Sequence, residues 1–264
     1  MYEVSKKLLA LAEDLNTHMP LRPGDFRLET DRYVIIFGAT EGPHGTVVQR
    51  FRMAPDEVSE TVTEIRTAIR KQGRTEALFE VGPSATPADL SAQLQHLGVS
   101  PFALEQQTEA LLLSNPAPGW LPPWPDSIRI SRVEDFDTYS RSQRVFWQCF
   151  GHVPENFAES VRKDYACYEG SPLWVRFAAS IGSEIIAVGD LVYTEEAAIL
   201  CGGATHPDFR GQGVYRALLA ARYEEACRLG VPRLLTQAGH MSQPILRRLG
   251  FQPLCMVNIF HDRL

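Results

Sequence analysis

The sequence predicts an α/β protein with a mixed sheet, in two parts that a proline-rich segment joins. Segments with the apolar period of a helix alternate with short segments rich in β-branched and aromatic residues. Residues 115–125 (NPAPGWLPPWP) hold five prolines, which neither a helix nor a central strand accommodates. The same order of elements occurs on both sides of this segment. We therefore expect a first domain at 1–114, a linker at 115–125 and a second domain at 126–264.

The first part begins with an amphipathic segment, MYEVSKKLLALAEDLN, that predicts a helix. Farther along, Val58, Val62, Ile65 and Ile69 recur at helical spacing, with Pro55 or Asp56 at the start. A third helix is expected to begin at Thr86 and to end before Gly98. Strands are expected at 32–37, 46–51, 75–81 and 102–113, with a turn at 41–45.

The second part predicts one strand, two helices and then three consecutive antiparallel strands, at 127–133, 136–150, 155–168, 174–180, 184–193 and 197–205. A long helix over 214–229 places Leu218, Leu219, Arg222, Ala226 and Leu229 on one buried face. A strand at 233–237, a short helix that Ser242 caps and a strand at 251–261 follow. Helix, strand, helix, Leu-Gly and strand therefore occur at 56–113 and again at 214–261, which indicates a degenerate internal repeat.

Composition excludes several classes of protein. The chain has 264 residues, 44% hydrophobic and 22% charged, which is ordinary for a globular protein. A net charge of −6 without a basic stripe argues against a nucleic-acid partner. No run of about 18 apolar residues predicts a membrane span, and the N-terminus does not resemble a signal peptide, so we expect a cytoplasmic protein. The five cysteines form no C-x-x-C pair, so we expect neither a disulfide framework nor a metal site. The sequence predicts no oligomeric state.

The segment with the clearest chemistry is AILCGGATHPDFRGQGVYRALL, residues 198–219. A strand ends near Thr205, and the tight turn Arg210–Gly213 leads directly into a helix. Consecutive backbone N–H groups of such a turn, with the unpaired donors of the helix, form an anion-binding cup that glycine keeps accessible to phosphate oxygens. A Walker motif is absent from the sequence, and Arg216 stands where a dinucleotide fingerprint needs its third glycine. A phosphate-bearing ligand of another kind is therefore expected.

This segment resembles the signature Q/R-x-x-G-x-G/A of the GNAT superfamily of acyl-CoA-dependent N-acyltransferases. Arg210-Gly-Gln-Gly213-Val-Tyr215 matches it after Thr205-His-Pro-Asp-Phe209, and Leu249-Gly-Phe251 resembles a second family feature. The resemblance implies a GNAT-like fold from Ile128 to the C-terminus. The first part resembles a truncated copy in which Arg52–Glu57 stands at the place of the glycine turn, so we expect no CoA there.

The resemblance also implies a cofactor site for acetyl-CoA, the co-substrate. The backbone of Ala204, Thr205 and His206 is expected to hydrogen-bond the pantetheine arm. The pyrophosphate is expected on the N–H groups of Gly211, Gln212, Gly213, Val214 and Tyr215, with Arg210 ordering the turn. Gly202-Gly203 predicts a bulge where the strand splays and admits the acyl group.

The sequence differs from the family pattern at two positions, and the catalytic acid and base cannot be assigned from the resemblance. Tyr215 replaces a small residue, and we expect its ring beside the cofactor. Leu246 stands where many family members have a tyrosine that protonates the leaving thiolate, so water or a hydroxyl such as Ser242 is left for that role, although Ser242 also fits a helix cap. Candidates for the base are Glu155, His152 and Asp190. Each also fits a structural role, and Cys201 fits a buried thiol better than a nucleophile.

These observations predict an acetyl-CoA-dependent acyltransferase that acetylates a primary amine of a small molecule or peptide by direct attack. Two alternatives stay open: a non-catalytic acyl-CoA-binding or regulatory module, and a transferase of a longer acyl group or to a hydroxyl. The acceptor cannot be predicted from the sequence.

Overall fold

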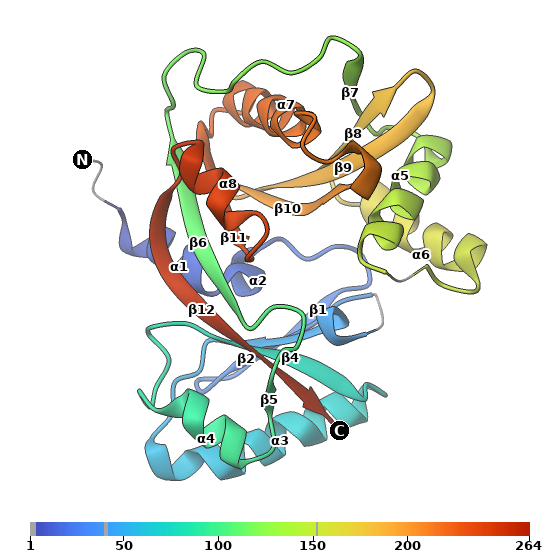
Figure 1. Cartoon of the computed structure of the whole chain (residues 1–264). Helices are drawn as coiled ribbons and strands as arrows, with labels where there is room; N and C mark the ends of the chain where they lie inside the picture. Colours follow the sequence, from blue (N-terminus) through green and yellow to red (C-terminus); the bar gives the residue numbers. More distant parts are fainter. Residues whose placement is uncertain (1–3, 40–41, 152) are drawn as a thin grey trace. The chain divides into compact units, whose positions relative to one another are not determined.

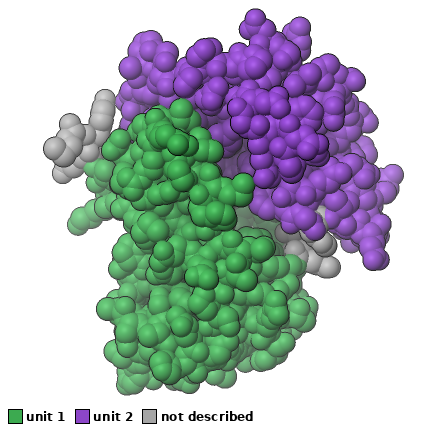
Figure 2. Space-filling view, in the orientation of Figure 1, with its two compact units in different colours: residues 1–111, 237–264 green, residues 112–236 purple. Residues whose placement is uncertain are grey.

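The computed structural model describes residues 4–39, 42–151 and 153–264. The chain packs into two compact units: unit 1 comprises residues 1–111 and 237–264, and unit 2 comprises residues 112–236 (Figure 2). The first boundary lies just before the expected linker. The end of the chain differs from the predicted division, because the C-terminal strand pairs with a strand of the first part and so packs in unit 1. The domains at 1–114 and 126–264 describe the order of repeated elements and stay a prediction.

Unit 1 contains a mixed sheet in the order β1-β2-β3-β4-β12-β6, and β5 also pairs with β12 (Figure 1). Strands β3 and β4 run parallel, while the pairs β1–β2, β2–β3 and β4–β12 are antiparallel. The strands are β1 (Phe26–Glu29), β2 (Val34–Phe37), β3 (Thr46–Gln49), β4 (Glu76–Val81), β5 (Ser100–Pro101), β6 (Gln107–Ser114) and β12 (Gln252–Arg263). The helices are α1 (Lys6–Glu13), α2 (Leu15–His18), α3 (Val58–Lys71), α4 (Leu90–His96) and α8 (Gln243–Arg248), with 3₁₀ turns η1 (Pro43–Gly45) and η2 (Pro55–Glu57).

The core of unit 1 confirms the predicted periodicity of α3. Val58, Val62, Ile65 and Ile69 are all buried in one cluster with aromatic and aliphatic residues of the sheet. Two details of the prediction are wrong. β1 was not expected, because its sequence FRLE is polar and its residues are largely exposed. Helix α4 begins after Asp89 rather than at Thr86, whose hydroxyl accepts the N–H of Met53 at 3.0 Å instead.

Unit 2 contains a five-stranded sheet in the order β11-β10-β9-β8-β7. The predicted antiparallel pairing of β8, β9 and β10 is confirmed, and β10 runs parallel to β11. The strands are β7 (Ile128–Arg132), β8 (Trp174–Ile181), β9 (Glu184–Tyr193), β10 (Ala198–Thr205) and β11 (Arg233–Ala238), whose last residues belong to unit 1. The helices are α5 (Phe136–Cys149), α6 (Phe157–Glu169) and α7 (Val214–Arg228), with η3 (Pro207–Phe209) before α7.

Helices α5 and α7 cover opposite faces of the unit 2 sheet. Gly189 faces Arg222 of α7, whereas the next residue, Asp190, points its side chain toward Arg176, which packs against α5. Successive strand residues point to opposite faces, so the two helices lie on different sides. Of the predicted α7 face, Leu218, Leu219, Arg222 and Ala226 are buried, but Leu229 is 45% exposed. The order β3-η2-α3-β4 in unit 1 matches β10-η3-α7-β11, as the repeat predicts.

Candidate functional site

The turn between β10 and α7 has a backbone that requires glycine. Gly211 and Gly213 have φ angles of +76° and +90°, a left-handed conformation that is costly for residues with a Cβ. The Arg210 side chain holds the turn, because its Nε donates to the carbonyl of Thr205 at 3.1 Å. Gln212 adds a second hydrogen bond, because its side-chain amide donates to the carbonyl of Asp208 at 3.0 Å. Arg210 therefore links the turn to the end of β10, and its part in a cofactor site stays a prediction.

The same turn presents unpaired donors. Helix α7 begins at Val214, and its N-cap residue Gly213 supplies no side chain to accept an N–H group. Within the described part of the chain, no acceptor is found for the N–H groups from Gly211 to Tyr215. Such a row of donors at the positive end of a helix dipole favours an anion.

Strand β10 contains the predicted bulge. Its register against β9 shifts between Cys201 and Ala204, and Gly202 has a φ of +57°. On its other side, β10 pairs with β11 at Ala198–Leu234 and Ile199–Leu235. Both partner pairs precede the bulge, so a glycine-rich, irregular stretch of backbone follows the regular ladder. The bulge predicted at Gly202-Gly203 is therefore confirmed, while its role in admitting an acyl group stays a prediction.

On the α5 face, a buried ion pair lies against this bulge. Asp190 accepts two hydrogen bonds from Arg176, at 2.7 Å from Nε and 2.8 Å from Nη2. Arg176 is 6% exposed and also donates to Gln143, which bonds Asp164. A Cβ on Gly202 would lie 2.6 Å from Asp190 Oδ2, so glycine is needed for this close approach. The sequence predicted Asp190 here but not Arg176, although opposite charges within two adjacent apolar strands were a usable signal.

On the α7 face, Tyr215 and Arg222 lie under the same strands. A Cβ on Gly203 would lie 3.9 Å from Tyr215 Cε2, so this ring is beside the bulge. Burial raises the pKa of Tyr215, and the Arg222 charge acts in the opposite direction. Arg222 is 1% exposed, and its Nη2 atom has no hydrogen-bond partner among the described residues.

The proline-rich segment at 115–125 lies along α7. Arg216 Nη2 donates to the carbonyl of Pro123 at 3.0 Å, and the rings of Trp120 and Tyr223 are 5.7 Å apart. Trp124 lies at the start of the helix, where its Cβ is 3.0 Å from the position of a Cβ on Gly213. The segment is therefore packed within unit 2.

At the end of β10, one backbone N–H group points away from the neighbouring strand β9. The N–H of His206 donates to Ile186, and its carbonyl accepts from Phe209. Ala204 is paired with Val188 in the same ladder. Because alternate residues of an antiparallel strand bond to the same neighbour, the N–H of Thr205 points away from β9. Of the three expected pantetheine contacts, Thr205 has the most suitable geometry.

The other catalytic candidates are distributed over both units. Glu155 is exposed, two residues before α6. His152 lies outside the described residues. Ser242 occupies the N-cap position of α8 in unit 1, but its side chain accepts no N–H group, and its Oγ is 3.4 Å from the carbonyl of Gly239. Leu246 is 1% exposed and apolar, so this position offers no proton donor.

The described ranges hold neither a disulfide nor a group of potential metal ligands. No disulfide is formed there by Cys149, Cys167, Cys201, Cys227 or Cys255. Between residues 4 and 264, leaving aside 40–41 and 152, no cluster of three His, Cys, Asp or Glu could hold a metal ion. None of the helices in those ranges has the length and apolar character to cross a bilayer.

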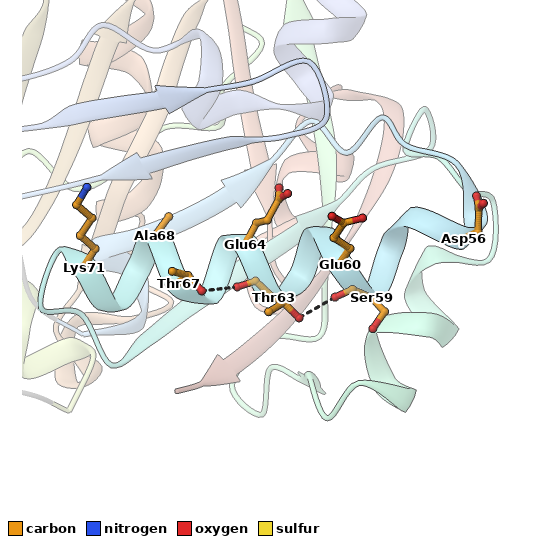
Figure 3. Close-up of a pocket in the computed structure, with 8 residues that line it drawn as sticks. All are labelled: Asp56, Ser59, Glu60, Thr63, Glu64, Thr67, Ala68 and Lys71. Atoms are coloured by element: carbon orange, nitrogen blue, oxygen red, sulfur yellow. Dashed lines mark hydrogen bonds between the residues drawn. The ribbon is translucent and has the colours of Figure 1, made fainter.

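A surface hollow on α3 is a poor alternative site. Figure 3 shows that one face of this helix lines it, together with Asp56 of the preceding turn η2. Two of its hydroxyls are used within the helix, since Thr63 donates to Ser59 at 2.9 Å and Thr67 to Thr63 at 2.8 Å. Its charged groups are three carboxylates and one ammonium, which disfavours a phosphate ligand. Its lining residues are Asp56, Ser59, Glu60, Thr63, Glu64, Thr67, Ala68 and Lys71.

Comparison with known proteins agrees with this geometry. The model of the Acetyltransferase (GNAT) family matches residues 139–251, which include the glycine turn and the bulge. A GCN5-related N-acetyltransferase from Kribbella flavida superposes with a TM-score of 0.69 at 16% identity, covering 96% of this chain and 95% of its own. A tandem GNAT protein from the clavulanic acid biosynthesis pathway gives 0.61 at 16% identity, with coverage of 90% and 82%. The search of curated proteins gave no match. The fold is thus that of tandem acetyltransferases along most of the chain.

Proposed function

We propose that this chain, whose residues 139–251 match the Acetyltransferase (GNAT) family and whose fold resembles solved GNAT proteins, transfers an acetyl group from acetyl-CoA to a primary amine of a small molecule or peptide. The observation that carries this proposal is the glycine turn of unpaired N–H groups directly after a bulged strand. The turn suits a pyrophosphate, and the bulge gives a thioester access to the strand backbone.

The cofactor would contact the backbone more than side chains. The pyrophosphate would lie on the N–H groups of Gly211 to Tyr215, with Arg210 and Gln212 fixing the turn. The pantetheine arm would pair with Thr205, flanked by Ala204 and His206. Backbone donors cost no reorganisation during the reaction, so they can position and polarise the thioester effectively.

The acceptor amine has to be neutral when it attacks. Asp190 is the base candidate closest to the bulge, but both of its oxygens accept from Arg176. A carboxylate held this way is better suited to shaping the site than to taking a proton. We therefore assign Asp190 and Arg176 to support of the bulge. Glu155 and His152 are left as base candidates, as is water.

One observation favours a second function. Position 246 is a buried leucine instead of a proton donor, which is compatible with a non-catalytic acyl-CoA-binding module. A transferase of a longer acyl group would also use the same turn. The donor, the acceptor and turnover therefore have to be measured together.

The test has two stages. Calorimetry and thermal melts with acetyl-CoA should show binding, with stabilisation of about 2.7 kcal/mol at about 100 times the dissociation constant. A screen of primary amines, with acetyl-, propionyl- and longer acyl-CoA donors, should then release free CoA. Absence of binding at millimolar acetyl-CoA contradicts the whole proposal, while binding without turnover favours the non-catalytic module.

A further inference from the structure

Strand β1 forms one edge of the unit 1 sheet. Among the described residues it pairs with β2 alone, in antiparallel register. Phe26 and Leu28 are exposed by 41% and 37% of their surfaces, and Glu29 is exposed as well. An edge strand of this kind presents unpaired backbone N–H and C=O groups, on which another strand can add.

The hydrogen bonds of the β1–β2 hairpin show which backbone groups face outward. The N–H of Thr30 donates to the carbonyl of Tyr33 at 3.0 Å, which continues the β1–β2 register by one step. Bonded and non-bonded pairs alternate along an antiparallel ladder, so Leu28 also bonds to β2. Arg27 and Glu29 therefore direct their backbone N–H and C=O groups toward the open edge.

The same two residues carry opposite charges and keep hydrogen-bonding capacity. Arg27 Nη2 donates to the carbonyl of Met19 at 3.1 Å, and Glu29 Oε1 accepts from Arg50 Nη1 at 2.6 Å. These two side chains make no other hydrogen bond within the described ranges, where Arg27 Nε is buried without a partner. Charges on an edge usually oppose strand pairing, but alternating signs oppose it only in some registers.

The strand that fits this edge is a second copy of β1 related by a two-fold axis. A register centred on Arg27 or on Glu29 places a charge opposite its own copy, which is unfavourable. The register centred on Leu28 places Arg27 of each copy opposite Glu29 of the other. It also joins the outward N–H and C=O groups of both residues and brings the two exposed Leu28 side chains together. Charge, backbone bonding and apolar contact therefore select the same register.

We propose that this chain forms a two-fold symmetric dimer in which the β1 strands of two copies pair antiparallel, with Leu28 at the axis. The inference goes beyond the proposed function and does not depend on it. Each copy contributes a strand of four residues, Phe26–Glu29, so the contact is small. Small interfaces are weak, and the dissociation constant should lie in the micromolar range.

Charge exchange across the axis tests the register. Sedimentation velocity of the full chain, from micromolar to millimolar concentration, measures the dimer. Glu29→Arg and Arg27→Glu each place like charges opposite one another, so each should weaken dimerisation at least about tenfold. The double variant, with both substitutions, should dimerise within about threefold of the wild type. An equimolar mixture of the two single variants should form a heterodimer, because every facing pair again has opposite charges.

Glu159→Arg is the matched control. Glu29 and Glu159 are exposed carboxylates that each pair with one cation, and Glu159 lies on α6 of unit 2, so this variant should dimerise like the wild type. Hydrogen exchange by NMR locates the contact, since the N–H groups of Arg27 and Glu29 should exchange more slowly as the protein concentration rises. The proposal is overturned by a wild type that stays monomeric at millimolar concentration. It is equally overturned by a dimer that both single variants leave intact, or by single variants that stay apart when mixed.

Discussion

Strands β3 and β10 each run antiparallel to one neighbour and parallel to the next, and each leads through a 3₁₀ turn into a long helix. The stretch from Ile199 to Pro207 is one residue longer than the equivalent stretch from Val48 to Pro55. An extra residue is what a bulge inserts into a strand. The first half lacks it, and with it lacks the pair of glycines that opens β10.

In unit 1, hydrogen-bonded side chains occupy the region beside the end of β3, which corresponds to the bulge of β10. Just after the last β3–β4 partners, Gln49 Nε2 donates to Glu80 Oε2 at 2.5 Å, and the same carboxylate accepts from Asn16. Gln49 Oε1 accepts from Thr17 of α2. The turn before α3 is also closed, because Glu57 accepts the N–H of Ala54 at 2.7 Å. A shared order of elements therefore does not predict a shared binding site, since Glu57 occupies one donor of this turn and Gln49 and Glu80 bond each other beside the strand.

The largest expected effect on stability comes from Asp190, the buried carboxylate beside β10. Asp190→Asn should destabilise the protein by about 3–5 kcal/mol, because it leaves Arg176 buried without a compensating charge. Urea unfolding at pH 7.5 measures this. The double variant Asp190→Leu with Arg176→Met removes both charges and should cost clearly less. A single variant as stable as the wild type would show that the pair has no structural role.

The turns that precede α7 and α3 should differ in ligand binding. Gly211→Glu should weaken acetyl-CoA binding by at least about 100-fold, because a negative side chain enters the anion cup. Gly230→Glu is the matched control: both glycines have a φ of +76° and open space around the Cβ position, so both variants carry the same backbone strain. Pro55→Glu places the charge in the turn of the first half. If either of these two variants weakened binding as strongly, the assignment of the cofactor turn would be wrong.

Replacing Glu80 by a neutral amide should raise the stability of the protein, whereas the same kind of change at Asp190 should lower it. Burial raises its pKa from 4.5 to about 7, so the folded state holds this proton more tightly than the unfolded state. Its contribution to stability is therefore greatest below pH 4.5 and is lost as the pH rises toward 7. Glu80→Gln should stabilise the protein by about 2–3 kcal/mol at pH 8 and have little effect at pH 4.5.

Thermal or urea unfolding across this pH range measures the effect of Glu80→Gln. The amide oxygen of the variant can still accept from Gln49 and Asn16, so the hydrogen bonds are kept. Asp14, whose pKa burial raises to about 6, retains part of the pH dependence in the variant. A variant that is less stable than the wild type at pH 8 would show that Glu80 is ionised and favourably paired.

Sequence patterns predicted the long elements and the glycine turn because these depend on local periodicity and on backbone conformation. The face of α3 and the bulge at Gly202-Gly203 are examples. The partners of buried charges could not be predicted in this way, because Arg176 meets Asp190 only after strands β8 and β9 pair. The short strand β1 and the start of α4 were missed for the same reason, since contacts distant in sequence outweigh weak local preferences there.

The smallest expected effect concerns the closed turn of the first half. Glu57→Ala removes the carboxylate that accepts the N–H of Ala54, and should cost about 1 kcal/mol of stability, as loss of a helix cap usually does. Acetyl-CoA affinity should not change, because we expect no CoA at this turn and its freed donor should bond water. Unfolding and calorimetry on one preparation measure both quantities. If Glu57→Ala created a second acetyl-CoA site, the side chain alone would be what separates the two halves, and the missing bulge residue would be of no consequence for binding.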